Sequence, residues 1–441
     1  RKLGFEILDY HLNLKQIVKV NTILNQINFK NLSKKSLLNL KIKKIPIGDL
    51  IYDHYLRYEQ KPTIDLDSKK LFLLIKNALE IFVFWDDFFD ENNVKRICFS
   101  HSPYLLGLPG RIAAFKRVDS LCLSGNSTFR FNKKNIFLGD QFKKSRDLLN
   151  NYLSSKGTRE KKYIIKKNKM IMNDIFSGRS SPSYYLPYNQ KNIFKKKNKG
   201  ISKISKNLKI LISAHDFYEG PNLWGKFIFA DFYEWLIYLS NYISKDKNSN
   251  REWYIKPHPD ASSEQLDIIK NIFKKNKNIK ILKPNTTHID LINKKINFVL
   301  TARGSVGYQY AYFGINSLYC SDIGLYKSFN FMYKSNSLKD YEKKLNDMER
   351  MSKRKTKISG VLEFMIILDI FIYNKRDFIL PDIEHITRKK KLYLFQARSE
   401  KYKIESLKIV KEFLTEKQII KIFNEIDNFI TKKNKLLMIT D

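Results

Sequence analysis

Short apolar segments alternate with amphipathic helical segments between residues 208 and 313, and this alternation constrains the fold more than any other feature. Four apolar runs have the length of buried strands: 208–213, 253–255, 279–282 and 296–300. The stretches between them have helical spacing or a helix-capping residue: 227–243, 263–274 and the segment from Thr287 onward. Strands and helices in turn predict a parallel sheet covered by helices, so this half is expected to be an α/β domain of the Rossmann type.

Polar side chains follow three of these strands. The candidates are His215, Asp216 and Glu219 after the first strand, Lys256 and His258 after the second, and Arg303, Gly304, Ser305 and Gln309 after the fourth. Because the carboxyl ends of parallel strands meet at one edge of a sheet, these loops are expected to converge on a ligand. Cationic and hydrogen-bonding groups in such a place favour an anionic ligand such as a phosphate.

Two of the loops have features of their own. Prolines on both sides of His258 fix the backbone of the turn Lys-Pro-His-Pro, which presents the imidazole with little freedom. Gly304 and Gly307 allow backbone N–H groups to approach a ligand, and a helix N-terminus follows. The alternatives are a satisfied surface histidine and an ordinary strand-to-helix turn.

The two motifs together resemble a known family. Ile-Lys-Pro-His-Pro at 255–259 and Thr-x-x-Gly-Ser-x-Gly-Tyr-x-Tyr-Ala-x-x-Gly at 301–314 resemble the donor half of GT-B glycosyltransferases of bacterial capsule and surface-polysaccharide biosynthesis. Kdo transferases and the sialyl or polysialyl transferases that use CMP-activated sugars belong to this group. The resemblance extends over about residues 205–345 and implies a GT-B-like architecture, in which two doubly wound Rossmann-type domains face a cleft and C-terminal helices follow.

The same resemblance implies a chemistry. His258 matches the histidine that contacts the nucleotide phosphate, and Ser305 lies in the matching glycine turn. Gln309 stands where such domains often place a glutamate that binds ribose hydroxyls. The expected reaction is metal-independent, inverting transfer of a sugar from a nucleotide donor, which is a substrate, so no cofactor is expected. Teichoic-acid glycerophosphotransferases share the Lys-Pro-His-Pro turn, so a CDP-glycerol polymerase is the alternative enzyme.

The amino half is expected to form a second α/β domain that binds the acceptor. A strand at 95–100 ending at His101, a helix at 111–117 and a strand at 119–124 predict a βαβ unit. Asp49, Asp53 and Arg57 follow one another at four-residue intervals on one helical face.

That spacing suits a surface ladder of ion pairs, or a carboxylate that takes the proton of the acceptor hydroxyl. Glu219 is the rival base, because Tyr218-Glu219-Gly220 matches the last two positions of the acidic-acidic-glycine motif of the resembling sialyltransferases. In those families the motif belongs to the amino-terminal domain, so Asp53 and Glu219 stay open as alternatives.

Composition sets the remaining expectations. We expect an acceptor-side domain at 1–200 that ends in a linker at 191–206, a nucleotide-sugar domain at 201–345 and a basic helical extension at 346–441. Three scattered cysteines provide neither a metal-ligand set nor a disulfide framework, which favours a cytoplasmic location. The apolar runs 71–85 and 361–373 are too short and too charged to cross a membrane and are expected to be buried helices.

The chain is strongly basic, with 82 Lys and Arg residues against 44 Asp and Glu residues and a formal net charge of +38. Nucleic acid is not the expected partner, because the basic runs show no recognisable binding module. Codon bias of an AT-rich genome explains part of the charge. Attraction to an anionic inner membrane face or to an acidic glycan explains the rest, and the expected acceptor is a surface glycan or glycolipid. A non-catalytic protein that binds polyanions or RNA on a degenerate transferase fold is the remaining alternative.

Overall fold

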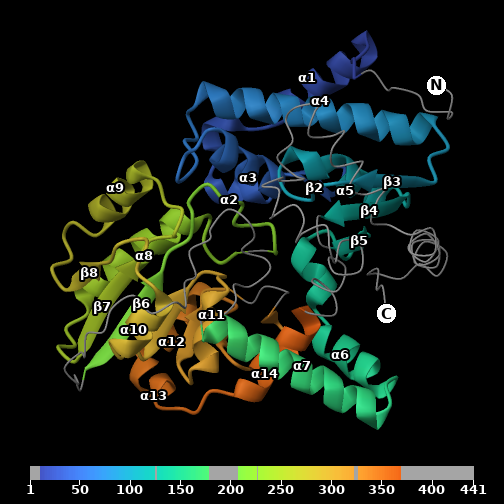
Figure 1. Ribbon diagram of the computed structural model, residues 1–441. Coiled ribbons are helices and arrows are strands. Elements are labelled where there is room, and N and C mark those ends of the chain that lie inside the picture. The colour runs from blue at the N-terminus through green and yellow to red at the C-terminus, as the bar shows by residue number, and fades with distance from the viewer. Residues whose placement is uncertain (1–9, 125–126, 178–206, 226, 322–325, 369–441) are drawn as a thin grey trace, which may run out of the picture.

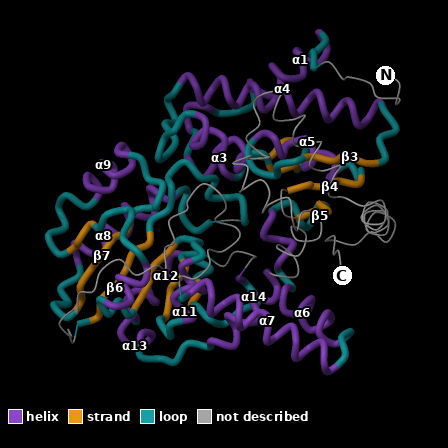
Figure 2. The backbone as a smooth tube through the Cα atoms, in the orientation of Figure 1, coloured by secondary structure: helices purple, strands orange, loops and turns teal. Residues whose placement is uncertain are grey.

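A computed structural model describes residues 10–124, 127–177, 207–225, 227–321 and 326–368 (Figure 1). The described residues contain two α/β units, one built on a six-stranded sheet and the other on a separate three-stranded sheet (Figure 2). The predicted α/β class is therefore confirmed. No described helix is long and apolar enough to span a membrane.

The larger sheet is parallel and contains six described strands in the order β11-β10-β9-β6-β7-β8. Its strands are β6 (Leu208–Ser213), β7 (Arg251–Lys256), β8 (Ile279–Ile281), β9 (Phe298–Thr301), β10 (Asn316–Tyr319) and β11 (Tyr333–Lys334). The chain moves outward from β6 to β8, then crosses back and places β9 on the other side of β6. This is the strand order of a dinucleotide-binding Rossmann sheet. The order in which successive strands are added to the sheet reverses between β6 and β9.

Helices cover both faces of this sheet. They are α8 (Phe232–Lys245), α9 (Ser263–Ile272), α10 (His288–Asn293), α11 (Val306–Tyr312), α12 (Leu338–Asn346) and α13 (Met348–Ser352). Side chains of α8, α9 and α12 form one buried cluster with Ile210 and Ile212, whereas α10 and α11 form another with Leu211. Successive residues of β6 point to opposite faces, and residues 208–212 are all buried because both faces are covered.

The helix expected at 227–243 begins later than the spacing of its aromatic residues indicates. Asp231 caps α8 by accepting a hydrogen bond from the backbone N–H of Glu234, so Phe229 lies before the helix. Phe229 still packs against the same core as Phe232 and Leu236. The expected cap at Thr287 is confirmed, because its hydroxyl accepts from the N–H of Asp290.

The amino-side unit contains a three-stranded sheet and several helices. Its described elements are α1 (Leu14–Asn25), α2 (Lys34–Leu38), β1 (Lys41–Ile42), β2 (Ile45–Pro46), α3 (Gly48–Tyr58), α4 (Lys69–Glu91), β3 (Arg96–Phe99), α5 (Leu108–Phe115), β4 (Asp119–Ser124) and β5 (Ser127–Phe131). The parallel pair β3 and β4, joined through α5, confirms the expected βαβ unit. The third strand, β5, is antiparallel, so this sheet is smaller than the larger one and mixed. The apolar run at 71–85 lies in α4, where Ile75, Leu79 and Phe82 are buried.

A third group of helices joins the two units. Helices α6 (Ser145–Ser154), α7 (Thr158–Phe176) and α14 (Ile358–Leu368) share a buried cluster with Tyr308 and Tyr319 of the larger sheet unit (Figure 1). Helix α14 thus packs against helices of the amino half. The expected linker at 191–206 and the part of the expected helical extension from residue 369 onward lie outside the described residues.

Candidate functional site

The candidate site lies at the carboxyl ends of β6, β7 and β9. Ser213 is in register with both Lys256 and Thr301, so the three strands end at the same level. The loops that follow carry His215, His258 and Arg303. Two of these loops stand on either side of the reversal between β6 and β9, which is where ligands bind in open sheets of this kind. The convergence predicted from the sequence is therefore confirmed for these three loops.

His215 forms the centre of this group. Its Nε2 accepts a hydrogen bond from the backbone N–H of Arg303 at 3.3 Å, which places the ring proton on Nδ1, and it lies 3.3 Å from Oγ1 of Thr301. The imidazole stacks on the ring of Phe232 at 4.6 Å between centroids. Burial, and then the charges of Arg303 and His258, hold the pKa of His215 well below its usual range. His215 is therefore a neutral group that fixes the two loops against each other.

Arg303 is the main buried cation of the site. Its side chain is 7% exposed, its Nη2 lies 3.6 Å from Oε2 of Glu219, and its guanidinium lies 5.2 Å from the ring centre of Phe232. Its other terminal nitrogen, Nη1, is buried and has no hydrogen-bond partner among the described residues. Burial lowers the pKa of Arg303, while the charges of Glu219 and Asp53 raise it. A buried donor without an acceptor is costly, so an anionic oxygen placed there would be bound favourably.

Lys256 and His258 are placed differently although only one residue separates them. Lys256 is 2% exposed, its Nζ donates to the carbonyl of Pro257 at 3.4 Å, and burial lowers its pKa to about 8. Its charge contributes to the lowered pKa of the buried His288, so it lies on the α10 side of the sheet. His258 is 31% exposed, and its Nδ1 accepts from the N–H of Asp260 at 3.3 Å. His258 can therefore contact a ligand, whereas Lys256 lies beneath the surface.

Close contacts with neighbouring side chains explain both glycines in the turn that follows β9. A Cβ on Gly304 would lie 2.9 Å from Oγ1 of Thr301 and 3.4 Å from the ring of His215. A Cβ on Gly307 would lie 2.2 Å from the hydroxyl of Tyr319, so this glycine makes room for a tyrosine, contrary to the expectation that it admits a ligand. The side chain of Ser305 does not cap α11.

Gln309 does not occupy the ribose-binding position that the motif suggested. Its side chain is 1% exposed on α11, so the structure buries its amide rather than presenting it. Asp216 has a structural role, because its Oδ1 accepts from the N–H of Tyr218 at 2.9 Å and from Nε2 of Gln265 at 2.8 Å. It orders the loop that carries Glu219.

The amino-side unit reaches this loop through Asp53. Asn222 donates to both of its carboxylate oxygens, with its backbone N–H at 3.1 Å and its side-chain amide at 2.8 Å. A Cβ on Gly220 would lie 2.6 Å from Oδ2 of Asp53, so only glycine fits here. Asp53 is 2% exposed, and burial raises its pKa to about 8. Tyr52 strengthens the same junction by donating to Oδ2 of Asp231 at 2.6 Å.

The other acceptor-side candidates do not join this group. The interpretation of Asp49, Asp53 and Arg57 as a surface ladder is wrong, because both carboxylates are buried. Asp49 accepts from Nη1 of the buried Arg111 at 2.6 Å, and Arg57 is exposed. His101 is exposed as well, and its Nδ1 lies 2.9 Å from the hydroxyl of Ser100. Of these residues, Asp53 alone contacts the loop that carries Glu219.

Tyr104 belongs to the candidate site although sequence reasoning missed it. The charges of Arg57, Asp53, Glu219 and Arg303 all act on its phenol, and burial raises its pKa. Its backbone has a positive φ of 60°, which is uncommon for any residue but glycine. The flanking Pro103 and Gly107 indicate a turn, but no sequence pattern relates Tyr104 to the charges of Glu219 and Arg303.

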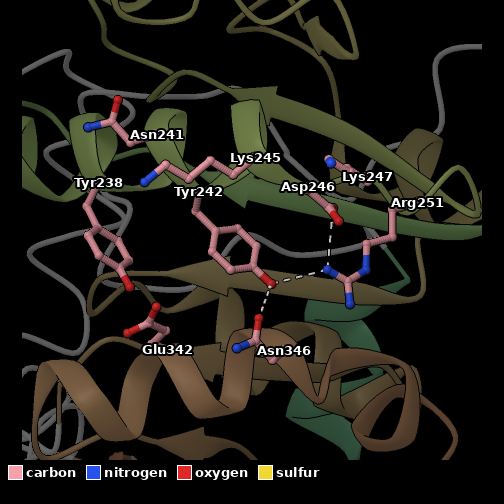
Figure 3. A pocket seen from close by; sticks show the side chains of 9 residues that line it. All are labelled: Tyr238, Asn241, Tyr242, Lys245, Asp246, Lys247, Arg251, Glu342 and Asn346. Atoms are coloured by element: carbon pink, nitrogen blue, oxygen red, sulfur yellow. Dashed lines mark hydrogen bonds and ion pairs between the residues drawn. The ribbon is translucent and has the colours of Figure 1, made fainter.

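The pocket drawn in Figure 3 lies elsewhere. It has a volume of about 410 Å³ and is lined by Tyr238, Asn241, Tyr242, Lys245, Asp246, Lys247, Arg251, Glu342 and Asn346. Arg251 begins β7, so this pocket is at the opposite end of the sheet from His258. Figure 3 shows Tyr242 between Asn346 and Arg251, to which its hydroxyl is hydrogen-bonded. Arg251 also pairs with Asp246. Four of the lining side chains are thus paired with one another, and we assign the chemistry to the other edge.

The described residues contain no group of three or more His, Cys, Asp or Glu side chains that could hold a metal ion. Cys98, Cys122 and Cys320 are free thiols.

Comparisons with known proteins gave structural matches alone. No protein-family model matches the chain, and no curated protein does either. The chain is similar to a crystal structure of UDP-GlcNAc 2-epimerase from Neisseria meningitidis bound to UDP-GlcNAc, with 12% identity over 66% of this chain and 80% of that one and a TM-score of 0.29. It is also similar to a putative UDP-N-acetylglucosamine 2-epimerase from Listeria monocytogenes, with 12% identity over 66% and 76% of the two chains and a TM-score of 0.32. The assignment of a Rossmann-type sheet rests on the strand order itself.

Proposed function

We propose that this protein is a nucleotide-sugar-dependent glycosyltransferase that moves a sugar, from a CMP-type donor, to a hydroxyl of a surface glycan. The observation that carries the proposal is the buried Arg303 at the reversal point of a Rossmann-type sheet, whose Nη1 has no hydrogen-bond partner among the residues that the structure describes. Such a group suits the phosphate of a bound nucleotide. The motifs around His258 and Ser305 favour a transferase, and the CMP assignment follows from that resemblance.

The donor phosphate would be held by Arg303 and His258. In the transfer step the acceptor oxygen attacks the anomeric carbon, the bond between that carbon and the phosphate oxygen breaks, and its electron pair stays on the phosphate. Arg303 would stabilise the negative charge that develops there, because a donor already fixed in a buried place needs no reorganisation. The partly exposed His258 would donate a second hydrogen bond to the same phosphate.

Glu219 is the better candidate for the base. Its side chain is 44% exposed, whereas Asp53 is buried and both of its oxygens already accept from Asn222. A base must come within hydrogen-bonding distance of the acceptor hydroxyl, and only an accessible carboxylate meets this condition. Asp53 would act as a positioning residue that holds the loop of Glu219 through Asn222. Glu219 lies 3.6 Å from Nη2 of Arg303, so a phosphate oxygen bound there would compete with it for the guanidinium.

The test is a turnover assay that follows release of the free nucleotide from CMP-sugars, UDP-sugars and CDP-glycerol in the presence of oligosaccharide acceptors. Release from a CMP-sugar supports the proposal, and release from CDP-glycerol alone would establish the glycerophosphotransferase alternative. We expect Glu219→Gln to lower kcat by roughly 100-fold or more while the donor still binds. Glu342→Gln, at the opposite end of the sheet, is the matched control and should keep full activity. Full turnover by a His258→Ala variant would refute the assignment.

A further inference from the structure

Helix α7 presents a strongly basic face to solvent. Its sequence contains six Lys and Arg residues and two acidic residues. Met172, Ile175 and Phe176 pack into the buried cluster that α7 shares with α14, and Figure 1 shows α7 along the lower right edge of the molecule. The outer side of the helix, which we call the α7 face, consists of exposed residues at helical spacing: Arg159, Lys162, Tyr163, Lys166, Lys169 and Met170.

The four cations of the α7 face form no ion pair with any residue that the structure describes. The nearby carboxylates are engaged elsewhere. Oε2 of Glu160 accepts from the backbone N–H of Gly157 at 3.0 Å, and its Oε1 lies 3.6 Å from Nζ of Lys156. The carboxylate of Glu363, the acidic residue of α14, lies 3.0 Å from Nη2 of Arg146 on α6. The α7 face is therefore a strip of positive charge that needs an anionic partner from outside.

The shape and composition of the strip suit the surface of an anionic bilayer. Four or more Lys and Arg residues clustered on one helix are typical of segments that bind anionic lipids. The strip extends over about 17 Å along a convex helix, so a flat surface can contact its whole length. Tyr163 is 67% exposed and Met170 is 58% exposed, and both lie among the cations. Tyrosine favours the membrane interface, and a thioether gains apolar contact between lipid headgroups, which the phosphate backbone of a nucleic acid does not offer.

We propose that the α7 face docks on a bilayer that contains anionic phospholipids, with the helix axis parallel to the membrane surface. The lysine and arginine head groups would contact lipid phosphates, while their aliphatic stems and the side chains of Tyr163 and Met170 would lie between the headgroups. The ring of Phe176 stacks on Tyr312 of α11 at 4.4 Å between centroids, so docking would hold the larger sheet unit at the membrane as well. This contact requires no particular reaction at the candidate site.

The test measures sedimentation of the full chain with sucrose-loaded vesicles at physiological ionic strength. Vesicles of phosphatidylcholine alone are compared with vesicles in which about a third of the lipid is phosphatidylglycerol. The wild type should bind the second kind, and added salt should weaken this binding. The α7 variant carries Arg159→Gln, Lys162→Gln, Lys166→Gln and Lys169→Gln. Because each cation near anionic lipid strengthens binding about fivefold, this variant should bind the anionic vesicles roughly 100-fold more weakly.

The matched control removes the same charge from exposed lysines near β8, on another side of the molecule, and should bind like the wild type (Figure 1). It carries Lys274→Gln, Lys275→Gln, Lys277→Gln and Lys283→Gln. Since all eight side chains are exposed, both variants should keep the melting temperature of the wild type.

A double variant, Tyr163→Ser with Met170→Ser, keeps the charge and should weaken vesicle binding roughly fivefold or more. Wild-type affinity in the α7 variant would overturn the inference, and so would an equal loss in the α7 variant and the control. Tighter binding of a mixed-sequence single-stranded RNA than of the anionic vesicles, lost in the α7 variant, would assign the face to nucleic acid instead. Unchanged vesicle binding by the double variant would overturn the placement of Tyr163 and Met170 among the headgroups.

Discussion

Asp53 makes the stability of this protein depend on pH in a direction opposite to that of most carboxylates. Its pKa rises from 3.8 to about 8 because burial disfavours the charged form more than the donors of Asn222 favour it. Between these two values the folded state binds a proton that the unfolded state has released, so the free energy of unfolding falls as the pH rises. Each pH unit in this window changes it by about 1.4 kcal/mol. Above pH 8 the dependence on this group levels off.

The perturbation is Asp53→Asn, which has the same shape and no charge. Its amide can keep both contacts if the side chain of Asn222 turns so that its oxygen accepts. Between pH 6 and pH 9 the wild type should lose roughly 3 kcal/mol of unfolding free energy relative to the variant. The loss comes from the interval between pH 6 and pH 8, since the dependence on Asp53 levels off above pH 8. Other titrating groups cancel in this difference.

The assay is urea unfolding at pH 6, 7, 8 and 9, followed by the fluorescence of the buried Trp235 and Trp253. The two proteins should have diverging curves, with the variant gaining stability relative to the wild type as the pH rises. Parallel curves would refute the reasoning, because they would show that Asp53 titrates in the folded state near its ordinary pKa.

Three other perturbations test separate parts of the account. Lys256→Met should raise the unfolding free energy at pH 7 by roughly 3 kcal/mol, because burial lowers the pKa of Lys256 from 10.5 to about 8 and the folded state therefore disfavours its charge. This gain should shrink between pH 8 and pH 10.5, and urea unfolding across this range measures it. Arg303→Met should abolish nucleotide binding in calorimetry. It should not lower the melting temperature, because a buried cation without full pairing adds little stability. A lower melting temperature would contradict this expectation. Gly307→Ala should destabilise the fold by about 1–3 kcal/mol or more through overlap with Tyr319, and a second substitution, Tyr319→Leu, should recover part of the loss in thermal denaturation.

Strands β6, β7, β8 and β9 of the larger sheet could be predicted from the sequence because each coincides with a short apolar run, whereas β10 and β11 were not predicted. β6 has the expected limits, whereas β7 is longer than the expected 253–255 and ends at Lys256. Helix starts were less accurate. The aromatic spacing that includes Phe229 continues past the point where Asp231 caps α8, and apolar spacing alone does not reveal a cap.

The candidate site was predicted in part, for a physical reason. Loops that follow parallel strands must meet at one edge, so the sequence pattern was sufficient to bring His215, His258 and Arg303 together. The roles of Asp49 and Asp53 depended on partners far away in the chain, Arg111 and Asn222, which helical spacing does not identify.

The role of Gly307 depended on Tyr319 in the same way. Contacts between distant segments are not encoded in local periodicity, and they decide which residues face a ligand.

The central claim is that Arg303 and His258 bind the phosphate of a nucleotide at the carboxyl edge of the larger sheet. Calorimetric titration of the wild type, Arg303→Met and His258→Ala with CMP, CDP, UDP and GDP tests it most directly. The account predicts that at least one nucleotide binds the wild type, and that both variants lose this binding while remaining folded. Nucleotide binding that is equal in all three proteins, or no nucleotide binding together with salt-sensitive binding of polyanions, would contradict it.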